Sequence, residues 1–212
     1  MNLRDLAHAQ RQPYLETLKD LVTLESPTHN KAANDKVAEY LETLLKNDAW
    51  AVERLSQTTV GDQLVARQDA PGDVSILIPC HFDTVWDIGT LQTMPLREEE
   101  DKLFGPGVLD MKAGITTAIH ALRLIKKNKL ELKGPVTLLL TSDEETGSEH
   151  SQKLIESQAK RHSRVLVLEP SRDDGALKVG RKGIGGFEVT FKGRSAHAGN
   201  NPKDGASAIK EL

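Results

Sequence analysis

The sequence predicts an α/β fold with a mainly parallel sheet sandwiched by helices. Short apolar runs that suit buried strands alternate with segments whose apolar residues recur at helical spacing, which is typical of this class. The 212 residues suffice for one domain or one and a half domains, and 38% of them are hydrophobic whereas only 4% are aromatic. We therefore expect a core built from Leu, Val, Ile and Ala.

The N-terminal part is expected to contain two helices followed by three strands. Pro13 stands where a first helix can begin, and Ser26-Pro27 ends its apolar pattern. A second helix begins near Asn30, which suits an N-cap, and continues to about residue 45. Strand-like runs follow at residues 51–55, 64–67 and 74–78.

The following part alternates helix and strand up to residue 180. Helices are expected at residues 112–127 and 149–159, and strands at 136–141 and 164–168. Further on, Phe187, Val189 and Phe191 alternate with other residues as in a strand, and a helix begins at 205–212. The sequence therefore divides into a first domain at 1–180 and the beginning of a second, small α+β domain at 181–212.

Charge and cysteine content exclude several classes of partner. The 28 Lys and Arg residues nearly balance the 31 Asp and Glu residues, so neither a nucleic acid nor an anionic membrane is an expected partner. The single cysteine, Cys80, rules out an internal disulfide and a thiolate metal cluster. No apolar run has the length of a signal peptide core or a membrane span, so we expect a cytoplasmic protein. The acidic run at 97–102 is interpreted as a solvated hairpin tip.

Side chains that can bind metal follow the predicted strands at the points where the strands end. In open α/β sheets, ligands bind outside the carboxyl ends of the strands, so we expect these side chains to meet. His81 and Asp83 follow the third predicted strand, Glu144 and Glu145 the fourth, and Glu169 the fifth, while Asp110 precedes the helix at 112–127.

These residue types suit a divalent metal, because zinc, cobalt and manganese accept imidazole and carboxylate ligands. Residues two apart in an extended segment point the same way, so Asp83 can orient His81 and set its tautomer. Of Glu144 and Glu145, one can bind metal while the other acts as a general base. The alternative is structural, since loop polarity and helix capping explain each residue singly, Asp110 as an N-cap. The residues alone leave both interpretations open.

Four motifs, in order along the chain, resemble those of the zinc carboxypeptidase and aminoacylase family. They lie at residues 81–85 (HFDTV), 105–114 (GPGVLDMKAG), 142–148 (SDEETGS) and 193–199 (GRSAHAG). The family includes bacterial glutamate carboxypeptidase, succinyl-diaminopimelate desuccinylase and acetylornithine deacetylase. The sequence is most similar to the glutamate carboxypeptidase branch, and the resemblance runs from about Pro13 onward.

The resemblance implies two zinc ions, with Co2+ or Mn2+ as alternatives, and names their ligands. His81 and Glu169 would hold one ion, Asp110 would bridge both, and Glu145 would help to hold the second. It also implies a catalytic zinc-hydrolase domain at 1–180 and the first part of a lid and dimerisation domain at 181–212. We expect no cofactor besides metal.

The same resemblance implies the catalytic roles. Glu144 would be the general base, Asp83 would orient His81, and His197 would reach across a homodimer to stabilise the oxyanion. The expected activity is hydrolysis of the amide bond of a short peptide or an N-acyl amino acid.

The sequence departs from the family pattern in two places. Cys80 stands where the family usually has glycine, and most of the lid, with a last histidine ligand of the second zinc, has no counterpart up to Leu212. Two alternatives to the hydrolase therefore stay open. One is a non-catalytic metal-binding fragment, and the other is a single-metal deacylase that uses only His81, Asp110 and Glu169.

Overall fold

The computed structural model describes residues 2–180, 182–183 and 185–210. The chain divides into two compact units, Met1–Pro170 and Ser171–Leu212, which we call the first and the second unit and describe separately. The assignment of a catalytic domain to 1–180 and of a lid to 181–212 stays a prediction.

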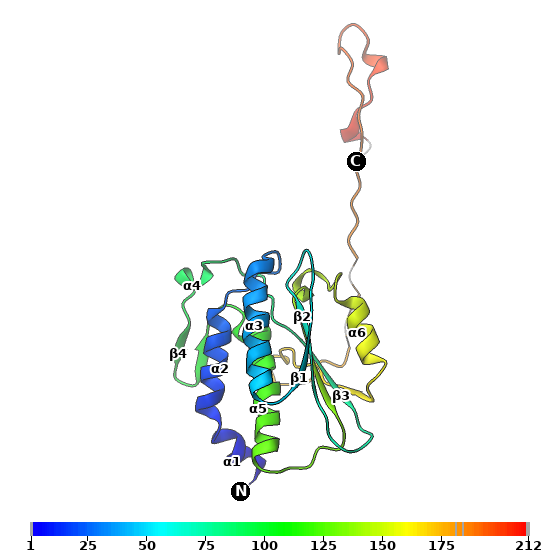
Figure 1. Ribbon diagram of the computed structural model, residues 1–212. Helices are drawn as coiled ribbons and strands as arrows, with labels where there is room; N and C mark the ends of the chain where they lie inside the picture. Colours follow the sequence, from blue (N-terminus) through cyan, green and yellow to red (C-terminus); the bar gives the residue numbers. More distant parts are fainter. Residues whose placement is uncertain (1, 181, 184, 211–212) are drawn as a thin grey trace. The chain divides into compact units, whose positions relative to one another are not determined.

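The first unit is built on a five-stranded sheet (Figure 1) with the order β1-β2-β6-β3-β7. Its strands are β1 (Ala51–Leu55), β2 (Gln63–Gln68), β3 (Ile76–His81), β6 (Val136–Thr141) and β7 (Arg164–Val165). Strands β6, β3 and β7 are parallel, whereas β1 and β2 are antiparallel to their neighbours. The α/β class is confirmed, and the sheet is mixed, with parallel pairing confined to the three strands that lead into the site.

Three strands differ from their expected bounds, and β2 is longer than expected by one residue at each end. β3 extends to His81, since its residues pair with β6 along the whole strand and His81 lies opposite Thr141. β7 ends at Val165 instead of residue 168, although Leu166 still donates its N–H to Leu77. β7 is the last strand at its edge of the described sheet, so only β3 holds it and its ladder is short.

Helices cover both faces of the sheet. Figure 1 shows α2 (Arg11–Thr23), α3 (Lys31–Asn47) and α5 (Ala113–Lys127) on one side and α6 (Gln152–Ala159) on the other. Two shorter helices are α1 (Leu3–His8) and α4 (Thr90–Thr93). The expected N-cap is confirmed, because the Asn30 side chain accepts a hydrogen bond from the N–H of Ala33. Among the described residues, no helix has both the length and the apolar character that a bilayer span requires.

The core lies mainly between the sheet and α2, α3 and α5, and it is aliphatic as expected. Alternate residues of β3 and β6 enter it, namely Ile78 and Cys80 from one strand and Leu138 and Leu140 from the other. They pack in one cluster with Leu41 of α3 and Ile115 and Ile119 of α5, all of them buried. Cys80 thus serves as a small apolar residue in the core.

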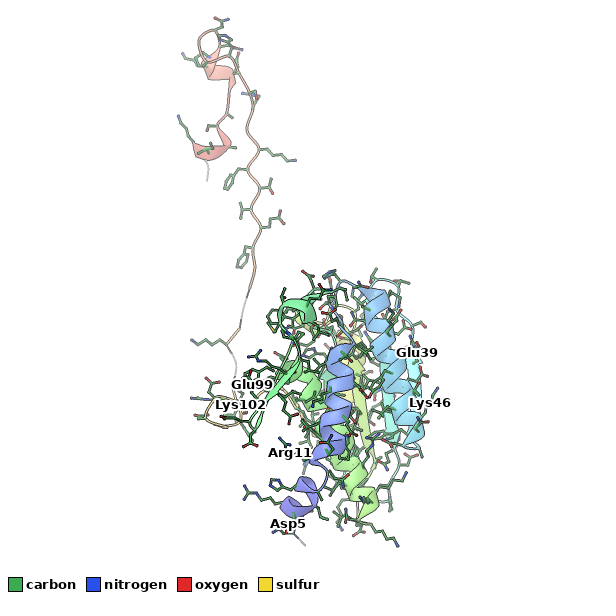
Figure 2. All side chains as sticks on the ribbon, turned by 90° about the vertical axis from the view of Figure 1, so that its left-hand side faces the viewer. Asp5, Arg11, Glu39, Lys46, Glu99 and Lys102 are labelled. Carbon is green, nitrogen blue, oxygen red and sulfur yellow. The ribbon has the colours of Figure 1, made fainter. Side chains whose placement is uncertain are left out.

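The acidic run at 97–102 forms a solvated hairpin, as expected. Its strands are β4 (Arg97–Glu99) and β5 (Lys102–Phe104), which pair antiparallel. Figure 2 shows Glu99 and Lys102 beside this hairpin on the outside of the unit. The Glu98 carboxylate lies 2.9 Å from Lys19 Nζ, so basic side chains partner this acidic run.

The second unit differs from its sequence-based prediction. The residues described between 185 and 193 form no strand, because the described part of this unit offers them no partner for a ladder. A single antiparallel bridge joins Arg194 to Ala206, and two short 3-10 turns follow at Pro202–Asp204 and Ala208–Lys210. Where a helix was expected at 205–212, the structure has only the turn at Ala208–Lys210. Residues 211 and 212 of that expected helix lie outside the described part.

Candidate metal-binding active site

The site lies at the edge where the parallel strands end. His81 is the last residue of β3, and it pairs with Thr141, the last residue of β6. Glu144 and Glu145 follow three and four residues after Thr141, in a short turn at Glu144–Thr146. Because β3 and β6 run parallel and in this register, the two motifs leave the sheet at the same level.

The His81 imidazole is the centre of the group. Its Nε2 atom lies 3.2 Å from Asp110 Oδ1, 3.4 Å from Glu169 Oε1 and 3.8 Å from Glu144 Oε2. The side chain of His81 is 1% exposed, whereas those of Asp110 and Glu144 are 58% and 50% exposed. A buried nitrogen therefore faces carboxylates that remain accessible from solvent.

Three of these groups fit one metal ion. One atom from each of His81, Asp110 and Glu169 forms a set whose members all lie within 4.8 Å of one another. Ligand bonds of about 2.0–2.1 Å in a tetrahedral zinc site place neighbouring ligand atoms about 3.3 Å apart. The distances from His81 Nε2 to the two carboxylates, 3.2 and 3.4 Å, agree with that spacing.

The tautomer of His81 also suits metal binding. Its Nδ1 atom lies 3.1 Å from the main-chain oxygen of Asp83 and 3.4 Å from Asp83 Oδ1. A carbonyl oxygen can only accept, so Nδ1 carries the proton and donates it. The lone pair of Nε2 is then available to a metal, which is the usual arrangement of a metal-binding histidine.

Asp83 organises the loops around His81. Its side chain is fully buried and accepts hydrogen bonds from Thr28 Oγ1 at 2.7 Å, from Glu144 N at 3.3 Å and from Glu145 N at 3.2 Å. One carboxylate thus joins the β3 end, the turn after β6 and the loop before α3. The spacing of Asp83 and His81 predicts their contact, whereas no motif in the sequence marks Thr28 as a partner of Asp83.

The electrostatics of the site favour positive charge. Burial alone would lower the pKa of His81, but hydrogen bonding to Asp83 and Glu169 and the charges of both raise it to about 11. Burial raises the pKa of Asp110, and the charge of Glu169 adds to this rise while His81 opposes it. Burial likewise raises the pKa values of Glu144 and Glu145, against the opposing effect of His81. A divalent cation bound here would displace the second proton of the His81 ring.

The segment at 110–114 lies close both to β3 and to the segment before Glu169. Met111 Sδ accepts the N–H of His81 at 3.2 Å. A Cβ atom on Gly114 would overlap the carbonyl oxygen of Leu168, the residue before Glu169. Only glycine therefore allows α5 to approach this segment so closely. The motif at 105–114 contains Gly114, but its role depends on a contact between distant parts of the chain.

A buried lysine anchors the same segment. The side chain of Lys112 is almost completely buried and donates a hydrogen bond from Nζ to the carbonyl oxygen of Leu24 at 2.9 Å. Burial lowers the pKa of Lys112 to about 7, although the charges of Glu25 and Asp83 act to raise it. This contact ties the start of α5 to the end of α2.

The structure brings together five of the seven site residues that the sequence singled out: His81, Asp83, Asp110, Glu144 and Glu169. Glu145 joins them through its main chain, which donates to Asp83, but it is not in the three-residue metal group. His197 lies in the second unit, and the contacts described for it are within that unit.

The α/β domain thus carries a histidine and carboxylates that can hold a metal ion at the carboxyl edge of its sheet, where ligands bind in open α/β folds. The family model described as "Peptidase family M20/M25/M40" matches residues 77–212, and the chain belongs to this family.

Similar proteins agree with this assignment. Carboxypeptidase G2 of Pseudomonas sp. (strain RS-16) is 36% identical over 209 residues, covering 97% of this chain and 50% of that protein. Succinyl-diaminopimelate desuccinylase of Rickettsia massiliae (strain Mtu5) is 28% identical, covering 89% and 54%. The chain thus spans about half the length of the curated relatives it matches.

Solved structures share the fold. A tripeptidase from Staphylococcus aureus superposes with a TM-score of 0.68 at 20% identity, covering 94% of this chain and 54% of that chain. Human carnosine dipeptidase 1 superposes with a TM-score of 0.65 at 17% identity, covering 76% and 39%.

Proposed function

We propose that this chain carries the metal-binding catalytic core of a hydrolase that cleaves the amide bond of a short peptide or an N-acyl amino acid. The observation that supports this most is the group of His81, Asp110 and Glu169, which fits a metal ion in a chain of this peptidase family. The names of the relatives, a carboxypeptidase and a desuccinylase, support cleavage of an amide bond, and the resemblance of the motifs adds a glutamate carboxypeptidase-like activity to the proposal.

The ligands divide between two zinc ions in this proposal, with Co2+ or Mn2+ as alternative metals. His81 and Glu169 would hold the first ion, Asp110 would be shared by both, and Glu145 would contribute to the second. The Asp110 carboxylate suits a shared role, because its side chain is 58% exposed and stays accessible beside its contact with His81.

Glu144 is the proposed general base. A divalent metal supplies Lewis acidity, which polarises the scissile carbonyl and acidifies water. Glu144 accepts a proton from the attacking water and returns it to the leaving amine. Its raised pKa, caused first by burial, brings the carboxylate closer to the range that proton transfer at neutral pH requires.

Asp83 and His197 have supporting roles. Asp83 fixes the His81 ring and the main chain of Glu144 and Glu145, so it positions both metal ligands and base. His197 stabilises the oxyanion across a homodimer of the complete protein. The proposal places the enzyme in the cytoplasm and includes no nucleic acid or membrane partner.

A single-metal deacylase is the second candidate, and a specific observation favours it. The metal group consists of His81, Asp110 and Glu169 and does not include Glu145. In this candidate Glu145→Ala scarcely changes turnover, whereas in the two-metal proposal it removes one zinc and most of the activity. Zinc content and turnover of this variant decide between the two.

The first experiment is zinc analysis of the purified, desalted chain, followed by hydrolysis assays with N-acyl glutamates and dipeptides. Bound zinc with turnover, both lost in His81→Ala, supports the proposal. Bound zinc without turnover on any of these amides would instead support the non-catalytic metal-binding fragment.

A further inference from the structure

His197 lies on an exposed loop of the second unit, where its own main chain folds back on its ring. Its Nδ1 atom accepts two backbone hydrogen bonds, from Gly199 N at 3.1 Å and from Asn200 N at 3.0 Å. Both donors are peptide N–H groups, which cannot reverse their direction.

These two contacts determine which ring nitrogen holds the proton. A nitrogen that accepts hydrogen bonds carries no hydrogen, so the neutral ring holds its proton on Nε2. The other tautomer would point an Nδ1–H at two N–H groups and lose both hydrogen bonds. His81 is the opposite case, since its Nδ1 faces the carbonyl oxygen of Asp83 and therefore donates.

Asn201 clamps the main chain of His197. Its Oδ1 accepts the N–H of His197 at 3.1 Å, and its own N–H donates to the carbonyl oxygen of His197 at 3.1 Å. The amide Nδ2 of Asn201 donates to Asp204 Oδ2 at 3.1 Å, which orients the side chain so that its oxygen points toward His197. The loop is thus held at His197 independently of the ring contacts.

We propose that Asn201 is a positioning residue which, with the N–H groups of Gly199 and Asn200, presents His197 as a neutral Nε2–H donor. A donor of this kind stabilises negative charge that develops on an oxygen atom. It cannot serve through Nε2 as a metal ligand or as a general base, because both roles require a lone pair there. The identity of that oxygen as the oxyanion of amide hydrolysis rests on the proposed function.

The tautomer can be measured without any activity. In the intact chain labelled with 15N-histidine, His197→Gln identifies the His197 signals by their loss. At a pH where the ring is neutral, we expect Nδ1 to resonate as an unprotonated nitrogen and Nε2 as a protonated one. The reverse pattern, or shifts averaged between the two forms, would overturn the proposal.

The role of Asn201 needs a variant series. Asn201→Ala should shift both ring nitrogens toward averaged values and lower kcat about fivefold with little change in KM, the size expected for one hydrogen bond. The double variant Asn201→Asp with Asp204→Asn exchanges donor and acceptor between the two side chains, keeps an oxygen toward His197 N, and should restore both readouts. Unchanged 15N shifts in Asn201→Ala would refute the positioning role.

The experiments distinguish a failure of the proposed hydrolase function from a failure of the proposed His197 tautomer and its positioning by Asn201. If the chain hydrolyses no amide, the 15N shifts of the wild type and of Asn201→Ala still confirm or refute the tautomer and its clamp. If turnover is present and His197→Gln leaves it intact, the oxyanion role is wrong even where the tautomer is as expected.

Discussion

Two groups of carboxylates in the first unit have opposite electrostatic states. In the ion-pair network of Lys31, Asp35, Arg54 and Asp62, the Asp62 carboxylate lies 2.7 Å from Lys31 Nζ and 2.8 Å from Arg54 Nε. Burial acts to raise the pKa of Asp62, but these partners and the N–H of Gln57 lower it to about 2. In the site group of Asp110, Glu144, Glu145 and Glu169, burial and mutual repulsion raise the pKa values of the first three.

The difference lies in the partners and not in the acidic residues themselves. In the network, each negative charge has a lysine or an arginine beside it, so the group is satisfied and serves stability. At the site, several carboxylates converge on one imidazole, and the group gains most from an added cation. A cluster of acidic residues thus becomes a candidate metal site only where the fold leaves its charge unbalanced.

The sharpest test of this comparison is Glu144→Gln. It removes the base but keeps the shape of the side chain, so we expect turnover to fall at least about 10²-fold. Zinc content should stay nearly unchanged, because Glu144 lies outside the three-residue metal group. The matched control is Glu99→Gln in the β4–β5 hairpin, an exposed carboxylate paired with Arg97, which should leave turnover unchanged. Substantial turnover in Glu144→Gln would rule out this base.

The next largest effect is expected for Asp83→Asn. The amide can no longer accept from both peptide N–H groups and Thr28 together, so the turn at Glu144 and the ring of His81 lose their support. Zinc affinity should fall about 10- to 100-fold, as found for residues that support metal ligands. Thr28→Val removes one donor only and should cause a smaller loss. Equal zinc affinities in titrations of wild type and Asp83→Asn would contradict the role of Asp83.

Gly114→Ala tests whether the site depends on close packing of α5. Alanine normally stabilises a helix relative to glycine by about 1 kcal/mol. Here its Cβ would displace Leu168 and with it Glu169, so we expect zinc affinity to fall about tenfold. The control in the same helix is Ala121→Gly at an exposed position, which should cost about 1 kcal/mol of stability and leave zinc affinity unchanged. An equally tight zinc site in Gly114→Ala would show that the contact can relax.

The smallest effect concerns the stability of the ion-pair network. The pKa of Asp62 is about 2 in the folded chain, below its unfolded value of about 3.9. The ionised Asp62 carboxylate therefore contributes to the free energy of unfolding, and this contribution is fully present above about pH 4. This contribution is lost as the pH falls toward 2. Asp62→Asn should lower the free energy of unfolding by about 1–2 kcal/mol at pH 7, with a flatter acid dependence in urea titrations. If the free energies of unfolding of wild type and Asp62→Asn changed with pH in parallel, the stabilising role of the ionised Asp62 carboxylate would be wrong.

Much of the fold and site could be predicted because the signals are local. The apolar run at 136–141 specifies β6 at its observed bounds, and Asn30 marks the start of α3. The positions of His81 and Glu169 after predicted strands and of Asp110 before a predicted helix indicate that these ligand-type side chains meet at one edge of the sheet. The antiparallel pairing of β1 and β2 was not predicted, because strand direction depends on which distant segments pair.

Other features had no local signal. The alternation of Phe187, Val189 and Phe191 suggested a strand, but alternation indicates only that a segment suits a sheet, and a ladder requires a neighbour. Thr28 reached the site because the loop before α3 lies beside the segment at Thr84, which donates its N–H to Ser26. Sequence spacing contains no information on such a contact.

The amino-acid sequence specifies the chemical groups of the site, most of the helices and strands that hold them, and the edge of the sheet at which they meet. These follow from residue chemistry and from hydrophobic period, which act over a few neighbouring residues. The proton position on His81, the convergence of carboxylates on its ring and the need for glycine at position 114 arise only in the folded chain. Those properties depend on distances between atoms of residues that are far apart in the sequence. Burial and charge act across these distances only after folding has brought the residues together.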